Sequence, residues 1–117
     1  MHNFKNLKVW QKSVDLAVKI YQATADFPSE EKFGLTSQMR RAGVSIPSNI
    51  AEGTAKSSSK SFSNSLEISL GESFELETQL IIAERVNLIS SEKANLIESD
   101  IAEIQKMITG LKSSLTL

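Results

Sequence analysis

Apolar residues recur at alternating spacings of three and four along most of the chain, and this spacing constrains the fold most strongly. In the C-terminal segment the intervals are 4, 3, 4, 3 and 4, the pattern of the buried seam of a helical bundle. The residues that make up this pattern are Ile97, Ile101, Ile104, Ile108, Leu111 and Leu115. Strands are not predicted, because there is no sustained period-two alternation and no Asn-Gly turn.

Three further amphipathic helices precede this one. The first carries Leu7, Trp10, Val14, Ala17 and Tyr21, is capped by Asn6 and ends at Phe27-Pro28. The second starts near Thr36, ends at Gly53 and carries Leu35, Met39, Ala42, Ile46 and Ile50. The third runs from about Ser61 to Asn87 and carries Phe62, Leu66, Leu70, Phe74, Leu76, Leu80, Ile81 and Ala83. Ser90 or Ser91 caps the fourth helix. The fold class is therefore all-α, a single antiparallel up-down-up-down four-helix bundle over residues 1–117.

The first helix has a second apolar set that lies off its main seam, namely Val9, Leu16 and Ile20. A monomeric bundle needs one stripe per helix, so this set predicts an interface with another subunit. A wider core face is the alternative, and the pattern does not choose between them. We assign Trp10 and Tyr21 to the core rather than to a base-stacking platform.

Pro47 interrupts the second helix. It has no N–H, and its ring crowds the carbonyl of Gly43, so we expect a kink with one segment to about Ser45 and a restart. Ser45 and Ser48 can bond backbone groups freed by the bend. Asn49 is either a buried polar residue that fixes register or a donor to carbonyls at the kink.

Composition argues against most enzyme classes. The chain has no cysteine, and its one histidine, His2, is near the N-terminus, so thiolate or histidine chemistry is not expected. Glu72, Glu75 and Glu77 lack the Glu-x-x-His motif of bundle metal sites and are expected to be surface acids. We therefore predict no enzyme activity, catalytic residue, metal, cofactor or small-molecule substrate. No apolar h-region or membrane-length run occurs, so we expect a cytoplasmic protein without a membrane partner.

Charge is distributed unevenly along the chain. Residues 1–60 carry a net charge of +4 and residues 61–117 carry −5. An up-down-up-down bundle brings the start of the first helix, the loop after the second and the end of the fourth to one end. This basic pole holds Lys5, Lys8, Lys12, Lys56, Lys60 and Lys112. With Glu52 and Glu67 nearby, its expected net charge is +4. The opposite end is expected to be richer in acids.

Antiparallel pairing of the second and third helices gives a testable register, in which facing positions sum to about 115. Arg40 is then expected to face Glu75, and Arg41 to lie near Phe74 and Glu75 or Glu77. The arginines are read as interhelical ion-pair partners that fix register, with phosphate binding as the alternative.

Three stretches, "LKVWQKSVDLAVKIY", "FPSEEKFGLTSQMRRAGVSIPSNIAEG" and "GESFELETQL", resemble the four-helix-bundle proteins encoded in intervening sequences of bacterial 23S rRNA genes. The resemblance covers nearly the whole chain. It implies an antiparallel bundle that can form a homopentameric ring. A related branch, the accessory protein of diversity-generating retroelements, is a basic pentamer that binds nucleic acid. This chain departs from the pattern at Lys56, where Arg is usual, and at Glu72, where Ser is usual.

Two functions follow as expectations. The first is a non-enzymatic homo-oligomer that binds RNA or DNA through the basic pole. The second is a purely protein–protein scaffold or accessory subunit that binds no nucleic acid.

Overall fold

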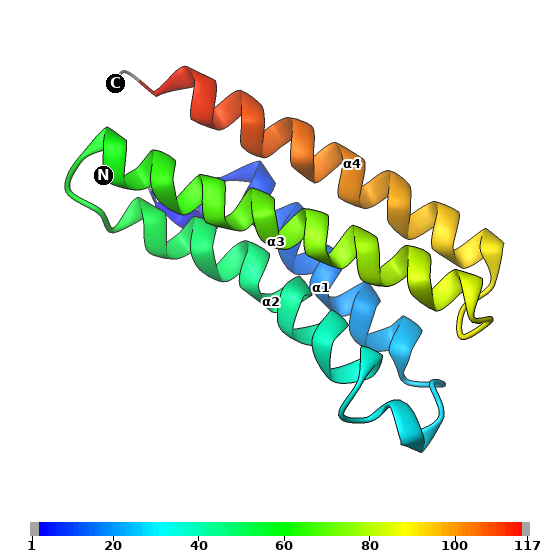
Figure 1. The fold of residues 1–117 in the computed structure, drawn as a ribbon. Helices are drawn as coiled ribbons and strands as arrows, with labels where there is room; N and C mark the ends of the chain where they lie inside the picture. Colours follow the sequence, from blue (N-terminus) through cyan, green and yellow to red (C-terminus); the bar gives the residue numbers. More distant parts are fainter. Residues whose placement is uncertain (1–2, 116–117) are drawn as a thin grey trace.

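The computed structural model describes residues 3–115, which form four α-helices and two short 3-10 turns (Figure 1). The helices are α1 (Lys8–Thr24), α2 (Leu35–Thr54), α3 (Ser59–Arg85) and α4 (Ser91–Ser114). The turns are η1 (Phe4–Asn6), before α1, and η2 (Ser29–Glu31), between α1 and α2. This part of the chain contains no strand, so the prediction of an all-helical bundle is confirmed. No helix within it is long and apolar enough to cross a membrane.

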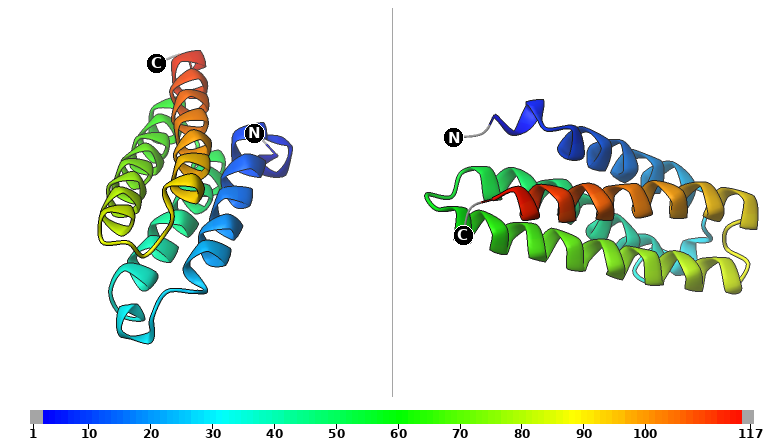
Figure 2. Two further views of the ribbon diagram at one scale, coloured as in Figure 1. Left: turned by 90° about the vertical axis from the view of Figure 1, so that its right-hand side faces the viewer. Right: turned by 90° about the horizontal axis from the view of Figure 1, so that it is seen from above.

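The helices pack in the order of the sequence around one axis. Neighbouring pairs are in contact and α1 also contacts α4, whereas within residues 3–115 no Cα atoms of the diagonal helix pairs lie within 8 Å of each other (Figure 2). Consecutive helices run in opposite directions (Figure 1), as contacts along α2 and α3 also show. Gly53, near the end of α2, lies against Phe62 at the start of α3, whereas Arg41, early in α2, pairs with Glu75 further along α3. The bundle measures 44 × 23 × 20 Å.

The core of α2 and α4 matches the sequence prediction. Met39, Ala42, Ile46 and Ile50 of α2 are fully buried, and so are Ile101, Ile104 and Ile108 of α4, with Ile97 nearly so. Ser90 caps α4, since its Oγ accepts the Lys93 N–H at 3.2 Å. Each of these helices has one apolar stripe, so periodicity alone identifies the buried side.

The prediction for α1 was wrong about the second apolar stripe. Val9, Leu16 and Ile20, assigned to an oligomer interface, lie inside the subunit core, as the wider-core alternative requires. The stripe assigned to the core is covered only in part. Trp10 is partly buried and packs against the core, whereas Tyr21 remains 47% exposed. Both stripes are apolar and have helical spacing, so only the position of α2 and α4 distinguishes them.

Two smaller expectations also failed. Phe74 and Ile81, placed on the buried face of α3, are exposed on its surface. Asn6 does not cap α1, because the 3-10 turn η1 intervenes, with the side chain of Asn3 capping that turn and Leu7 preceding α1. Just after the C-terminal end of α3, Asn87 adopts a positive φ of 65°, a conformation that asparagine tolerates. The Leu88 N–H donates a hydrogen bond to the Ala83 carbonyl at 2.8 Å, which closes the end of the helix.

Helix α2 is continuous across Pro47, so the expected restart after Ser45 does not occur. The bend itself stays a prediction. Polar side chains around the proline donate to backbone carbonyls four residues earlier, each at 2.8 Å: Ser45 to Arg41, Ser48 to Val44 and Asn49 to Ser45. Asn49 thus acts as a donor to a carbonyl close to Pro47, one of the two roles left open for it. These bonds support a helix turn from which proline removes one donor.

Small residues bring α2 and α3 into close contact. Ser69 and Ser73 are completely buried, and Ser69 Oγ donates across the seam to the Ile46 carbonyl at 2.9 Å. A Cβ atom added at Gly53 would lie 2.8 Å from both Phe62 Cδ1 and Ser65 Cβ. The seam therefore has no room for a side chain at this position.

Two glycine-to-alanine substitutions test the close seam. Gly53→Ala should destabilise the fold by about 1–3 kcal/mol, because overpacking outweighs the gain in helix propensity. Gly110→Ala is the matched control, since nothing lies within 4 Å of its added Cβ, and it should stabilise by up to about 1 kcal/mol. Urea denaturation followed by circular dichroism measures both. Equal effects of the two substitutions would contradict a steric limit at Gly53.

Candidate functional site

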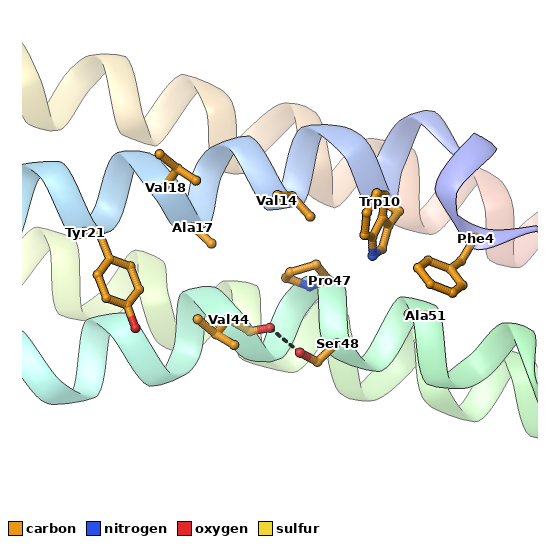
Figure 3. A pocket seen from close by; sticks show the side chains of 10 residues that line it. All are labelled: Phe4, Trp10, Val14, Ala17, Val18, Tyr21, Val44, Pro47, Ser48 and Ala51. Atoms are coloured by element: carbon orange, nitrogen blue, oxygen red, sulfur yellow. Dashed lines mark hydrogen bonds between the residues drawn. The ribbon is translucent and has the colours of Figure 1, made fainter.

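An apolar groove lies between α1 and α2, with the partly buried rings of Phe4 and Trp10 near one end and the exposed Tyr21 near the other (Figure 3). It has a volume of about 430 Å³. Its lining comprises Phe4, Trp10, Val14, Ala17, Val18, Tyr21, Val44, Pro47, Ser48 and Ala51. Phe4, from η1, packs edge-to-face on Trp10 with ring centroids 5.1 Å apart. Apart from the Ser48 hydroxyl and the polar tips of Trp10 and Tyr21, the side chains offer only hydrocarbon, so the groove suits an apolar partner.

A second apolar surface lies on the outer side of α3. It consists of side chains that the bundle leaves exposed, namely Ile68, Phe74, Ile81, Ile82 and Val86. Helix α3 occupies the corner diagonal to α1 (Figure 2), so this surface and the groove are on different sides of the molecule. Contiguous exposed apolar surface commonly marks an interaction site.

The three segments that carry the lysines of the basic pole lie together, as the topology predicts. The start of α1, the connection between α2 and α3 and the end of α4 lie at the same end of the bundle (Figure 1). Three of the six lysines of the pole, however, are neutralised by carboxylates. Lys12 pairs with Glu103 at 2.7 Å, Lys112 with Glu67 at 2.5 Å, and Lys56 with Glu52 at 3.7 Å.

Glu103 is a carboxylate that sequence reasoning did not place at the pole. Its hydrogen bond and its charge raise the pKa of Lys12, so it offsets the charge of one lysine of the pole. Lys5, Lys8 and Lys60 are exposed and have no ion-pair partner among the described residues. These three lysines are the ones available to an external anion.

The two arginines of α2 have different roles. Arg41 pairs with Glu75, as the register predicts, and also reaches Glu72 at 3.5 Å. Arg40, expected opposite Glu75, instead turns to α1, where its Nε donates to Thr24 Oγ1 at 2.9 Å. Its guanidinium lies 4.5 Å from the centroid of the Tyr21 ring. Consecutive helix positions differ by about 100° around the axis, so adjacent arginines contact different neighbours.

Two carboxyl groups meet between α3 and α4. A hydrogen bond with Glu77, partial burial and the nearby charges of Glu77 and Glu84 raise the pKa of Glu98 to about 7. The same hydrogen bond, and one from Gln105 Nε2 at 3.0 Å, lower the pKa of Glu77. Protonated Glu98 therefore donates to the Glu77 carboxylate. Across residues 3–115 no three His, Cys, Asp or Glu side chains could hold a metal ion, and His2 lies outside the described residues.

These features define a four-helix-bundle protein with an apolar groove, an exposed apolar α3 surface and a basic end. The chain belongs to the 23S rRNA-intervening sequence protein family, whose model matches residues 5–110. It is also similar to a crystal structure of a protein of unknown function from the S23 ribosomal protein family of Bacteroides thetaiotaomicron. The two share 31% identity and a TM-score of 0.81, over 91% of this chain and 99% of the other. No curated protein matches the sequence.

The carboxyl pair predicts how stability depends on pH. Glu98 holds its proton to about pH 7 when folded but only to its ordinary value of 4.5 when unfolded, so its contribution to stability falls as pH rises between these values. Glu98→Gln keeps a donor to Glu77 and removes the titration. The variant should match the wild type near pH 4.5 and have the higher melting temperature at pH 8.

Glu77→Gln is the companion variant for this measurement. It leaves a single carboxyl group in the pair, so the pH-dependent loss of stability should also shrink. Thermal unfolding of the three proteins from pH 4.5 to pH 8 gives the comparison. Parallel curves for the wild type and Glu98→Gln would contradict the shared proton.

Proposed function

We propose that this chain is a non-enzymatic homo-oligomer that binds RNA or DNA through its basic pole. The observation that carries nucleic-acid binding is the convergence of Lys5, Lys8 and Lys60 at one end, exposed and without carboxylate partners in the described part of the chain. They come from η1, α1 and α3, so the fold itself gathers them. Phosphate contacts of this kind give affinity without reading sequence.

Oligomerisation is supported by the two apolar surfaces. The groove between α1 and α2 and the exposed side of α3 are different patches on different sides, so a head-to-tail contact between copies can join one to the other. Repetition of such a contact closes into a ring when the rotation allows it. The family resemblance described above implies five subunits. The interface is thus proposed at the groove rather than at Val9, Leu16 and Ile20, which the subunit core buries.

A ring would strengthen a weak basic site. Each subunit offers few free lysines, but subunits arranged in parallel present them on one face, and linked binding events add avidity. The rival function is a protein scaffold that binds no nucleic acid. It is favoured by the neutralisation of Lys12, Lys56 and Lys112 within the subunit.

The assembly is tested by placing a charge in the groove. Val18 lines it and is 49% exposed, so Val18→Glu should dissociate the oligomer and preserve helicity, because the core is untouched. Leu96→Glu on α4, at a site 66% exposed, is the matched control and should retain the oligomer. Light scattering measures the mass. A wild-type monomer at micromolar concentration, or an unchanged mass for Val18→Glu, would refute the proposed interface.

Nucleic-acid binding is tested with a short RNA or DNA duplex. Lys8→Glu combined with Lys60→Glu should abolish binding. Lys93→Glu combined with Arg85→Glu changes net charge equally at exposed sites at the opposite end of the bundle, and it should not abolish binding. Wild-type affinity should fall steeply with salt, by about one power of the salt concentration per neutralised phosphate. Gel shift across a salt series measures this. If the wild type binds no duplex even at low salt, the scaffold function is the one that survives.

A further inference from the structure

A second hollow lies on the other side of Tyr21, beside the N-terminal part of α2, and its chemistry differs from that of the groove. It has a volume of about 530 Å³, within the range of small-ligand sites. Its lining is Tyr21, Lys32, Phe33, Thr36, Ser37, Arg40, Arg41, Val44 and Ser45. The hollow is therefore lined by three cationic side chains, two aromatic rings, and three side-chain hydroxyls besides that of Tyr21. None of its lining residues is acidic.

Phe33 is the least expected residue of this hollow. It lies in the connection between η2 and α2 and is 87% exposed, whereas Phe27, which lies before η2, is buried in the core. Burial of a phenylalanine contributes about 1.5–3 kcal/mol, which Phe33 does not obtain within the subunit. The ammonium of Lys32 lies 5.5 Å from the centroid of the Phe33 ring, and it has no ion-pair partner between residues 3 and 115. An exposed ring beside a free cation is a surface on which a base can stack.

Arg40 supplies a positioned cation on the same hollow. Two of its five N–H donors are used, by Thr24 Oγ1 at 2.9 Å and by the Tyr21 carbonyl at 3.4 Å, and its guanidinium stacks on the Tyr21 ring. No carboxylate of the described chain forms an ion pair with it, in contrast to Arg41, which Glu72 and Glu75 neutralise. The remaining N–H groups of Arg40 can donate to phosphate oxygens without a change in the position of the side chain.

We propose that this hollow binds a nucleotide whose base is unpaired, with the base stacked on Phe33 and the phosphate held by Arg40 and Lys32. A free mononucleotide and a nucleotide within a single strand share this chemistry. In a duplex the bases are already stacked on each other, so a duplex cannot use the site. Binding of a single strand in this hollow rests on the proposed nucleic-acid binding. The hollow would add base stacking at a place separate from the basic pole.

The experiment compares an unstructured single strand with a duplex of the same sequence, by fluorescence anisotropy. Phe33→Ala should weaken single-strand binding roughly tenfold, the effect of losing one stacked base, and leave duplex binding unchanged. Phe33→Tyr keeps a ring and should retain wild-type affinity. Leu96→Ala removes another exposed apolar side chain, from α4, and should change neither value. Lys32→Gln should weaken single-strand binding, whereas Lys93→Gln, at an exposed site at the start of α4, should not.

The outcomes separate this inference from the proposed function. If Phe33→Ala leaves single-strand binding intact while Lys8→Glu with Lys60→Glu abolishes it, the pole binds and the hollow does not. If the wild type binds neither nucleic acid, the proposed function fails. Titration with adenosine monophosphate then tests separately whether the hollow binds a nucleotide. In the wild type, adenosine monophosphate should change the amide NMR signals of residues 33–37, and Phe33→Ala should remove these changes. Unchanged wild-type signals would overturn the proposed nucleotide site. A change of mass in Phe33→Ala would assign Phe33 to a subunit contact and also overturn the proposal.

Discussion

The close approach of α2 and α3 is the constraint on which the bundle depends. Their contact is the most extensive between any two helices, and small residues maintain it, from Gly53 at one end to Ser73 further along. The hydroxyl of Ser69 reaches the Ile46 carbonyl, at the peptide bond that leads into Pro47. This bond joins α3 to the part of α2 whose own hydrogen bonding is weakened by proline. With this pair fixed, α1 packs on α2 and α4 packs on α3, and the two outer helices close the remaining side.

The predictability of each helix depended on how many apolar stripes it carries. Helices α2 and α4 have one each, so the spacing of Met39 and Ile46, or of Ile101 and Ile108, identified the buried side directly. Helix α1 has two, about a third of a turn apart. The stripe with Trp10 and Tyr21 is the more aromatic, but the stripe with Leu16 is the one that α2 and α4 cover. Periodicity measures how apolar a face is, and it contains no information on which neighbour covers it.

The site residues show the same limit. A short connection fixes the register of α2 against α3, so the pairing of Arg41 with Glu75 was predictable. Arg40 differs by one position and contacts α1, whose orientation the register did not specify. The partner of Lys12 was missed for a related reason, since α1 and α4 are joined by no loop that could set their register. Phe33 could have been noticed from sequence as an aromatic residue outside every helical stripe, next to Lys32 and before Gly34.

The contact between α1 and α4 is the least extensive of the four helix pairings, and two exposed ion pairs, Lys12–Glu103 and Lys19–Asp100, bridge it. Exposed ion pairs contribute little and are screened by salt. Helix α1 should therefore open before the α2–α3 pair does, and its amides should exchange hydrogen faster at high ionic strength. Because α1 forms one wall of the apolar groove, a subunit docked there would hold α1 against α2 and so stabilise this weakly held helix. The stability of each protomer would then depend on protein concentration, which links folding of the first helix to assembly.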